Sequence, residues 1–191
     1  MRAPPQRIKK YCILGLDPSV TNFGMAWVTA GGALGGMHTI TTKKLQGMPR
    51  VAHIVELVKG TVGTLMGEHS RVVVAREDYA YASHSSSDAV LKELGGVLEW
   101  ELYKMGVSLY KVGVSQVKKV ITGKGNSEKD QMMLCVYKNF GVDPVNEHQA
   151  DAFGVAFTSF LLLSKAGKTA AQREVIDAAI KTEHPLTRID W

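Results

Sequence analysis

Three stretches of the chain each carry an acidic residue where a strand or helix is expected to end or begin. Asp17 follows an apolar run, Glu77 follows a second one, and Asp151 lies in the first turns of an apolar helix. Element ends that are far apart in the sequence can meet at one edge of a folded sheet. Carboxylates that meet there repel one another, and such a cluster normally needs a bound cation. The pattern therefore predicts a site for divalent metal ions.

Two neighbours of Asp151 could complete such a site. His148 and Glu147 precede it by three and four residues, so all three share one face of the predicted helix. An imidazole is an acceptable ligand of Mg²⁺ and a better one of Mn²⁺, and the residues alone leave open whether His148 or Glu147 would bind. Two ions roughly 3.5–4 Å apart can activate a water and stabilise the leaving oxygen of a phosphodiester. The alternative is that each acid merely caps a turn or a helix, but only a metal site requires the acids to converge.

The chain is basic overall, in contrast to the predicted acidic site. It has 23 Lys and Arg against 18 Asp and Glu, which gives a formal net charge of +5. The excess is uneven, because residues 104–138 hold two acids and seven lysines: Lys104, Lys111, Lys118, Lys119, Lys124, Lys129 and Lys138. Such a local excess is typical of contact with a phosphate backbone, although a solvated lysine face is the alternative. An acidic pocket in a basic chain favours a metal-dependent enzyme that acts on a polyanion.

The order of the predicted elements indicates a mixed sheet covered by helices. Strands are expected at 11–17, 22–29, 37–42, 72–77 and 107–112. Helices are expected at 49–68, from Ser87 or Asp88 to 105, after a cap at Ser115, from a capping box at 127–130 to 140, at 147–165 and at 169–181. The glycines at 31–32 and 35–36 bracket a predicted turn, and short connections predict an antiparallel meander for the first three strands. This order resembles the RNase H-like architecture, an α/β fold with a mixed five-stranded sheet flanked by helices.

The length of 191 residues favours one folded domain. We expect it at 11–165, after a basic N-terminal arm at 1–10 and before a partly helical C-terminal extension at 166–191. Cys12 and Cys135 are expected to be buried thiols, which favours a reducing compartment. The arm lacks the apolar region of a secretory signal, and no apolar run approaches membrane-spanning length. The sequence therefore predicts a cytoplasmic protein that has no membrane partner.

Four short runs, in this order, resemble the RuvC-type Holliday junction resolvases, and most of all their divergent phage-type members. The runs are Leu14–Pro18, Gln116–Val120, Thr122–Lys129 and His148–Ala152, and the resemblance extends over about residues 13–163. Each run is a weak signal alone, whereas four in the family's order are specific. The chain departs from the family at Ser19, where members have glycine, and at His148, where many members have an acid.

The resemblance implies a set of functional residues. The metal-binding catalytic centre would consist of Asp17, Glu77, His148 and Asp151, with Mg²⁺ as the cofactor and Mn²⁺ as its substitute. Lys118 and Lys129 would contact phosphates near the scissile bond and stabilise negative charge in the transition state. The wider DNA contacts would include Lys119, Lys124, Tyr79 and Tyr81, the tyrosines by stacking on an exposed base or, alternatively, by packing only.

The resemblance also implies a reaction and a partner. The family acts as a homodimer that nicks two opposed strands of a four-way DNA junction and leaves 5′-phosphate ends that a ligase can seal. The setting would be a bacterial cell or a phage-infected host. Three alternatives stay open: a nuclease with a broader range of flaps and forks, a junction-binding protein without catalysis, and an actin-like ATPase or sugar kinase. The last is disfavoured because it needs two such lobes.

Overall fold

A computed structural model of the chain describes residues 11–78 and 86–188, except for the side chains of 86–88. The strands of this part are β1 (Tyr11–Asp17), β2 (Asn22–Thr29), β3 (Leu34–Thr41), β4 (Arg71–Glu77) and β5 (Leu109–Val112). They form one sheet in the order β3-β2-β1-β4-β5. Strand β2 is antiparallel to β1 and β3, whereas β4 is parallel to β1 and to β5. The mixed five-stranded sheet that the sequence predicts is therefore confirmed.

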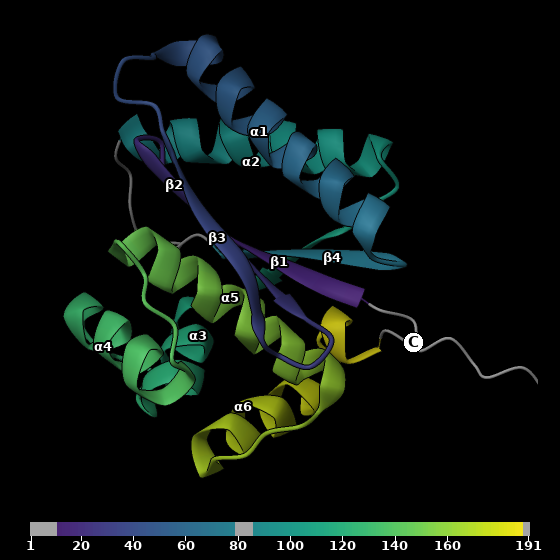
Figure 1. The fold of residues 1–191 in the computed structure, drawn as a ribbon, viewed down its shortest axis with the longest axis vertical. Helices are drawn as coiled ribbons and strands as arrows, with labels where there is room; N and C mark the ends of the chain where they lie inside the picture. The colour runs from purple at the N-terminus through teal and green to yellow at the C-terminus, as the bar shows by residue number, and fades with distance from the viewer. Residues whose placement is uncertain (1–10, 79–85, 189–191) are drawn as a thin grey trace, which may run out of the picture.

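Helices cover both faces of this sheet (Figure 1). They are α1 (Gly47–Glu68), α2 (Ser86–Lys104), α3 (Val114–Thr122), α4 (Lys129–Phe140), α5 (Glu147–Ser164), α6 (Ala170–Lys181) and the short 3₁₀ helix η1 (Pro185–Arg188). Helices α1 and α2 lie over one face. Helix α5 lies over the other face and is itself surrounded by α3, α4 and α6.

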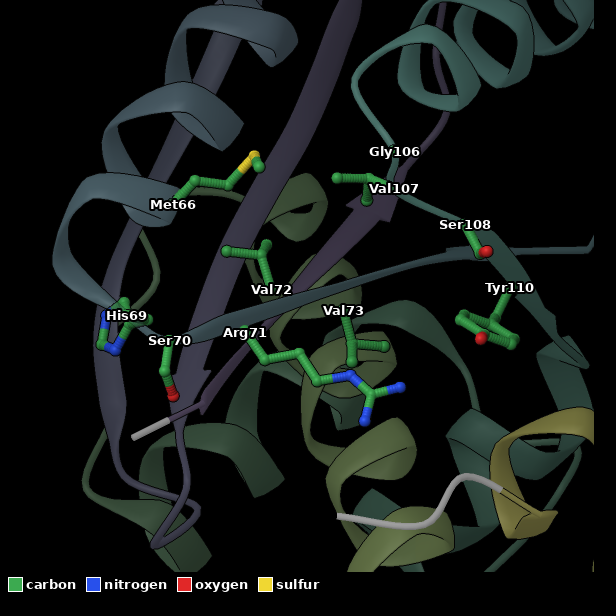
Figure 2. A pocket seen from close by; sticks show the side chains of 10 residues that line it. All are labelled: Met66, His69, Ser70, Arg71, Val72, Val73, Gly106, Val107, Ser108 and Tyr110. Atoms are coloured by element: carbon green, nitrogen blue, oxygen red, sulfur yellow. The ribbon is translucent and has the colours of Figure 1, made fainter. Parts of the chain in front are cut away.

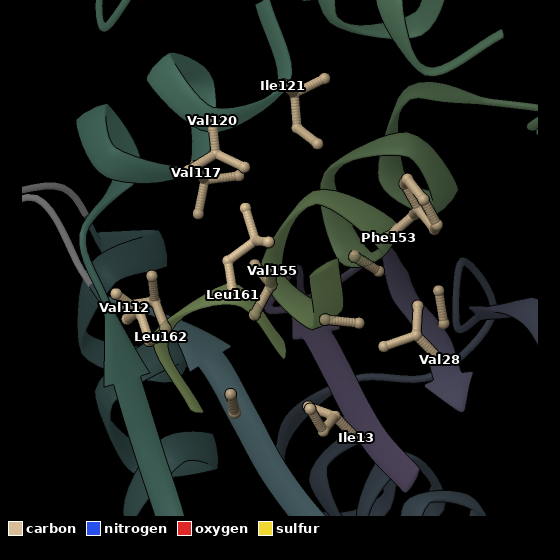
Figure 3. Close-up of a cluster of buried hydrophobic side chains, with 14 of the residues drawn as sticks. Ile13, Val28, Val112, Val117, Val120, Ile121, Phe153, Val155, Leu161 and Leu162 are labelled. Carbon is tan, nitrogen blue, oxygen red and sulfur yellow. The ribbon is translucent and has the colours of Figure 1, made fainter. Parts of the chain in front are cut away.

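Alternation of side chains along β1 gives the sheet two apolar cores. Cys12, Leu14 and Leu16 join the buried residues of α1 and α2 on one side. Ile13 points to the opposite side, where a cluster packs between the sheet and the helices around α5 (Figure 3). A strand that is buried on both faces needs apolar residues at nearly every position, which is why this run has no polar alternation.

Two glycines allow α5 to approach the sheet at backbone contact distance. A Cβ atom at Gly15 of β1 would lie 2.2 Å from the carbonyl oxygen of Ala152. A Cβ atom at Gly24 of β2 would lie 2.1 Å from the carbonyl oxygen of His148. Any larger residue would push the helix outward. The first two turns of α5 are therefore seated on the ends of β1 and β2.

The turn that the sequence predicts between β2 and β3 is present, but it ends before Gly35 and Gly36. Strand β3 begins at Leu34 and includes both glycines. The indole of Trp27, on the neighbouring strand β2, lies against them, since a Cβ atom at Gly36 would be 2.3 Å from the ring. The glycines thus provide room for an aromatic side chain across the strands, which a search for turn residues does not detect.

Two predicted helix caps are also wrong. Helix α3 begins at Val114 rather than after Ser115, and the N–H of Gly113 donates to Gln116 Oε1 at 3.1 Å. At α4, Ser127 does not cap the helix. Its hydroxyl lies 2.6 Å from Thr122 Oγ1 and donates to the Lys124 carbonyl at 3.0 Å. The serine therefore links the two ends of the glycine-rich loop, and Glu128 is the residue before the helix.

Some expectations lie partly or wholly outside the described residues. The basic arm at 1–10 and both candidate stacking residues, Tyr79 and Tyr81, are outside them. The caps expected at Ser87 or Asp88 fall inside α2, which begins at Ser86.

Both cysteines are free thiols, but only one is buried as predicted. Cys12 is buried, whereas Cys135 is partly exposed. Among the helices within the described ranges, none is long and apolar enough to cross a bilayer.

The close approach of α5 predicts that Gly24→Ala destabilises the fold. The added methyl group would meet the carbonyl oxygen of His148, and overpacking of this kind costs about 1–3 kcal/mol. The measurement is the free energy of unfolding in urea. Gly60→Ala is the matched control, because Gly60 lies inside α1 with no neighbour near the new Cβ, and it should stabilise the protein by roughly 0.5–1 kcal/mol. Equal stability of both variants would contradict the seating of α5 on Gly24.

Candidate active site

The carboxyl ends of β1 and β4 place two acids at one edge of the sheet. The two strands are parallel and their last registered pair is Leu16 with Arg76, so Asp17 and Glu77 follow side by side. Alternation puts both side chains on the face of Ile13, which α5 covers. Asp17 is buried and Glu77 is partly exposed.

Helix α5 brings a third candidate residue to the same edge. Its N-cap is Asn146, whose Oδ1 accepts the N–H of Gln149 at 3.0 Å and whose Nδ2 donates to Thr39 Oγ1 on β3 at 3.1 Å. These two contacts fix where the helix begins above the sheet. His148 Nδ1 then lies 2.7 Å from Asp17 Oδ2, although the two residues are 131 positions apart in the sequence.

Asp151 and Glu77 have the electrostatic properties of crowded carboxylates. Burial, and after it the charge of Asp17, raises the pKa of Asp151 to about 6. Burial, followed by the charges of Asp17 and Asp151, raises the pKa of Glu77 to about 8. Raised pKa values of this kind mean that the negative charge here is not fully compensated. The three acids therefore act on one another across the end of the sheet.

A chain of charged contacts leads from these acids to the protein surface. The hydrogen bond to Asp17 is the main cause that raises the pKa of His148. His148 Nε2 lies 3.8 Å from Glu147 Oε1, and the same oxygen lies 3.1 Å from Lys129 Nζ. The hydrogen bond to Glu147 raises the pKa of Lys129, so this lysine stays positively charged at the rim of the site. Glu147 is thus engaged by Lys129 in this structure.

The other predicted phosphate-contacting lysines lie at different distances from the acids. Lys118 on α3 is near enough that its charge opposes the rise in the pKa of Glu77. Lys119 on the same helix forms an ion pair with Glu174 of α6 instead. Lys124 lies in the loop between α3 and α4 and is exposed. The structure therefore brings Lys118 and Lys129 to the acids and places Lys119 and Lys124 along a surface beside them.

Arg76 is a neighbour of the site that sequence reasoning missed. Its side chain is buried at 4% exposure and faces the side of the sheet opposite to Glu77. The Arg76 Nη1 group donates to the carbonyl oxygen of Glu77 at 2.8 Å and lies 3.9 Å from Asp78 Oδ1. This contact holds the backbone that carries Glu77. The only signal in the sequence is a charged residue inside an otherwise apolar strand.

The donor chemistry of the site fits a divalent cation. The carboxylates of Asp17, Glu77 and Asp151 offer hard oxygen ligands, and a cation would relieve the repulsion that raises their pKa values. In the part of the chain that the structure describes, no three His, Cys, Asp or Glu side chains are already arranged to hold an ion. His148 bonds to Asp17 in this arrangement.

A cavity of about 260 Å³ lies elsewhere and is not this site (Figure 2). Its side chains come from the end of α1 and the residues after it, the first residues of β4, the connection from α2 to β5 and β5 itself. They include His69, Arg71 and Tyr110. This is the opposite end of the parallel strands from Glu77. Among the described residues that line the cavity there is no acid, and so none of the ligands that the candidate chemistry requires.

Comparison with known proteins found similar sequences over most of the chain. A family model described as "Crossover junction endodeoxyribonuclease RuvC" matches residues 13–159. A RuvC from a Sulfurovum species is 32% identical over 135 residues, which cover 68% of this chain and 81% of that protein. A RuvC from Thermus thermophilus is 28% identical over 159 residues, which cover 76% and 91% respectively.

Two solved structures show that the fold is shared as well. A structure of Thermus thermophilus RuvC is similar with a TM-score of 0.65 at 22% identity, over 82% of this chain and 98% of that one. A T. thermophilus RuvC in complex with Holliday junction substrate has a TM-score of 0.64 at 23% identity, over 76% and 90%. The similarity supports the RNase H-like arrangement of the sheet and its helices.

The raised pKa of Glu77 predicts how stability depends on pH without metal. Its ordinary pKa is 4.5 and its folded value is about 8, so the folded state keeps a proton that the unfolded chain has lost, and stability falls as pH rises between these values. Glu77→Gln should therefore raise the free energy of unfolding at pH 8, on the order of a few kcal/mol, and flatten this decline. Thermal melts of the parent and the variant from pH 5 to 9, in the presence of a chelator, would measure this pH dependence.

The control for that experiment is Glu56→Gln. Glu56 is an exposed glutamate on α1 that pairs with Lys59, so its removal should leave the pH profile unchanged. A Glu77→Gln variant that is less stable than the parent protein at pH 8 would contradict the electrostatic account of the site.

Proposed function

Because the chain belongs to the RuvC family of crossover junction endodeoxyribonucleases, we propose that it resolves four-way DNA junctions by paired, metal-dependent nicks that leave 5′-phosphate ends. The observation that carries this proposal is the meeting of Asp17 and His148, at 2.7 Å, beside two further acids. A purely structural role would not explain why acids from β1, β4 and α5 share one buried edge against their own repulsion.

The RuvC family is one of divalent-metal-dependent nucleases, and the residues that would hold the metal here are Asp17, Glu77, Asp151 and His148. We propose Mg²⁺, with Mn²⁺ as an effective substitute because one ligand is an imidazole. When bound, the ions supply activation of the attacking water and stabilisation of the leaving oxygen. The protein contributes rigid strand ends for two of the ligands. It also contributes an α5 N-terminus that is fixed by Asn146.

Lys118 and Lys129 would position the scissile phosphate and balance the charge that develops on it. The charges of both ammonium groups oppose the rise in the pKa of Glu77, which supports this role. Lys129 is held by Glu147 until a phosphate competes for it. Donors that are already oriented toward developing negative charge stabilise a transition state without further reorganisation.

Two nicks on opposed strands require two sites, so we propose a homodimer on branched DNA. A T. thermophilus relative has been solved with a Holliday junction substrate, which supports the choice of substrate. Helix α2 offers a surface for a second copy, because Trp100 and Tyr103 are 59% and 71% exposed and stack at 5.9 Å. The DNA would also contact Lys119, Lys124, Tyr79 and Tyr81.

The proposal predicts that Asp17→Asn abolishes cleavage and spares binding. Loss of a metal ligand should slow nicking of a synthetic four-way junction by more than about 100-fold, whereas junction affinity should be unchanged or tighter because an acid facing the phosphates is gone. The assay follows cleavage with Mg²⁺, with Mn²⁺ and with a chelator. Full turnover of Asp17→Asn in Mg²⁺ would overturn the assignment of Asp17.

Other DNA substrates, assayed alongside the four-way junction, distinguish the alternative functions. Linear duplex, flap and fork DNA measure whether the nuclease is selective for four-way junctions or acts on branches more broadly. A cruciform plasmid shows whether the two nicks are coordinated, since two coordinated nicks linearise it and a single nick only relaxes it. Junction binding without cleavage in either metal would favour a non-catalytic binding protein.

The proposed function also predicts that Lys129 acts in the chemical step more than in binding. Lys129→Ala should slow the single-turnover rate by roughly 10- to 100-fold and weaken junction binding by no more than a few-fold, because its charge acts at the scissile phosphate. Lys138→Ala is the control, as Lys138 lies at the other end of α4. Equal losses of rate and of affinity would reduce Lys129 to an ordinary backbone contact.

A further inference from the structure

Helix α6 and the segment after it lie beyond the part of the chain that matches the family model, which ends at residue 159. They are nevertheless fixed to the domain. Val175, Ile176 and Ala179 of α6 are buried in the core around α5. His184 Nε2 lies 2.9 Å from the carbonyl oxygen of Lys111, at β5. Helix α6 and residues 182–188 are thus packed against the domain, and α6 lies beside α3.

Between α6 and the glycine-rich loop lies a groove of about 570 Å³. Its lining is polar and basic on the side of α3 and the loop, and includes one acid on the side of α6: Ser115, Lys119, Lys124, Asn126, Glu174 and Ala178. The groove runs along α3, which begins directly after the end of β5, and the last residue of β5 is registered with Glu77. Helix α3 therefore connects the edge of the sheet that carries Glu77 with this groove.

The acid in the groove is already engaged. Glu174 forms an ion pair with Lys119, and this pair joins α6 to α3. The side chain of Glu174 is 68% exposed, and an ion pair that is this open to water adds little to folding stability. Its larger effect is on charge, because it neutralises one of the two lysines in the groove before any ligand arrives.

We propose that this groove binds the phosphate backbone of one arm of the DNA substrate and that Glu174 is a built-in competitor for Lys119. The inference rests on the proposed junction-cleaving function. The ammonium, amide and hydroxyl groups of the groove are donors that suit phosphate oxygens. A phosphate at Lys119 must displace the carboxylate of Glu174 or remain beside it, so α6 lowers the affinity of the protein for DNA.

The test is a comparison of Glu174→Gln with Glu183→Gln. Both changes remove one negative charge from the same C-terminal segment. Glu183 is a matched control because it is similarly exposed, at 73%, and pairs with Arg188 away from the groove. Glu174→Gln should bind a four-way junction about 2- to 10-fold more tightly at low salt. The slope of log association constant against log salt concentration should become more negative by up to about 0.9, which is the contribution of one additional phosphate contact.

A double-variant cycle supplies the second measurement. Lys119→Gln should weaken binding less in the parent protein than in the Glu174→Gln background, where the lysine is available to phosphate. Equal affinities for Glu174→Gln and Glu183→Gln, or equal costs of Lys119→Gln in both backgrounds, would overturn the inference. Cleavage by the parent protein is scored separately. If it cleaves and Glu174→Gln binds no more tightly, the inference alone fails. If it cleaves no branched DNA, the proposed function fails.

Discussion

The contact between α5 and the ends of β1 and β2 is the constraint on which the rest of the molecule depends. Gly15 and Gly24 remove the side chains that would otherwise separate helix from sheet, and the helix backbone occupies their place. This approach seals the core on one face of the sheet. It also delivers His148 to Asp17 at hydrogen-bond distance. The same close approach therefore packs the core and assembles the candidate site. A larger residue at Gly15 or Gly24 would disturb both.

This arrangement is electrostatically unfavourable. Asp17, Glu77 and Asp151 are crowded where burial already disfavours charge, and the pKa values of the latter two rise as a result. A protein selected for stability alone would avoid such a cluster. The hydrogen bond from His148 and the nearby lysines offset part of the repulsion. A bound cation would relieve the remainder.

Much of the fold was predictable because it follows from local patterns. Doubly buried strands are apolar throughout, and the buried positions of α1 recur with helical spacing despite Gly60 and Gly63. The acids of the site could be found by their places at element ends. Sequence reasoning did not find the start of α3 at Val114, the loop contacts of Ser127, the space for Trp27 at Gly36 or the role of Arg76. Trp27 reaches Gly36 from a neighbouring strand. Gln116, Ser127 and Arg76 bond to partners within five residues, but which nearby partner each uses depends on the geometry of the folded backbone.

The sequence by itself determined the types and order of the elements and which acids stand at their ends, because hydrophobic periodicity and capping preferences act over a few residues. Only the tertiary structure decided that His148 bonds to Asp17, that Glu147 turns to Lys129, and that Glu174 of the C-terminal helix holds Lys119. These pairs join segments that no local rule connects. Their geometry is set by how closely helices and sheet can pack, and that depends on every side chain between them.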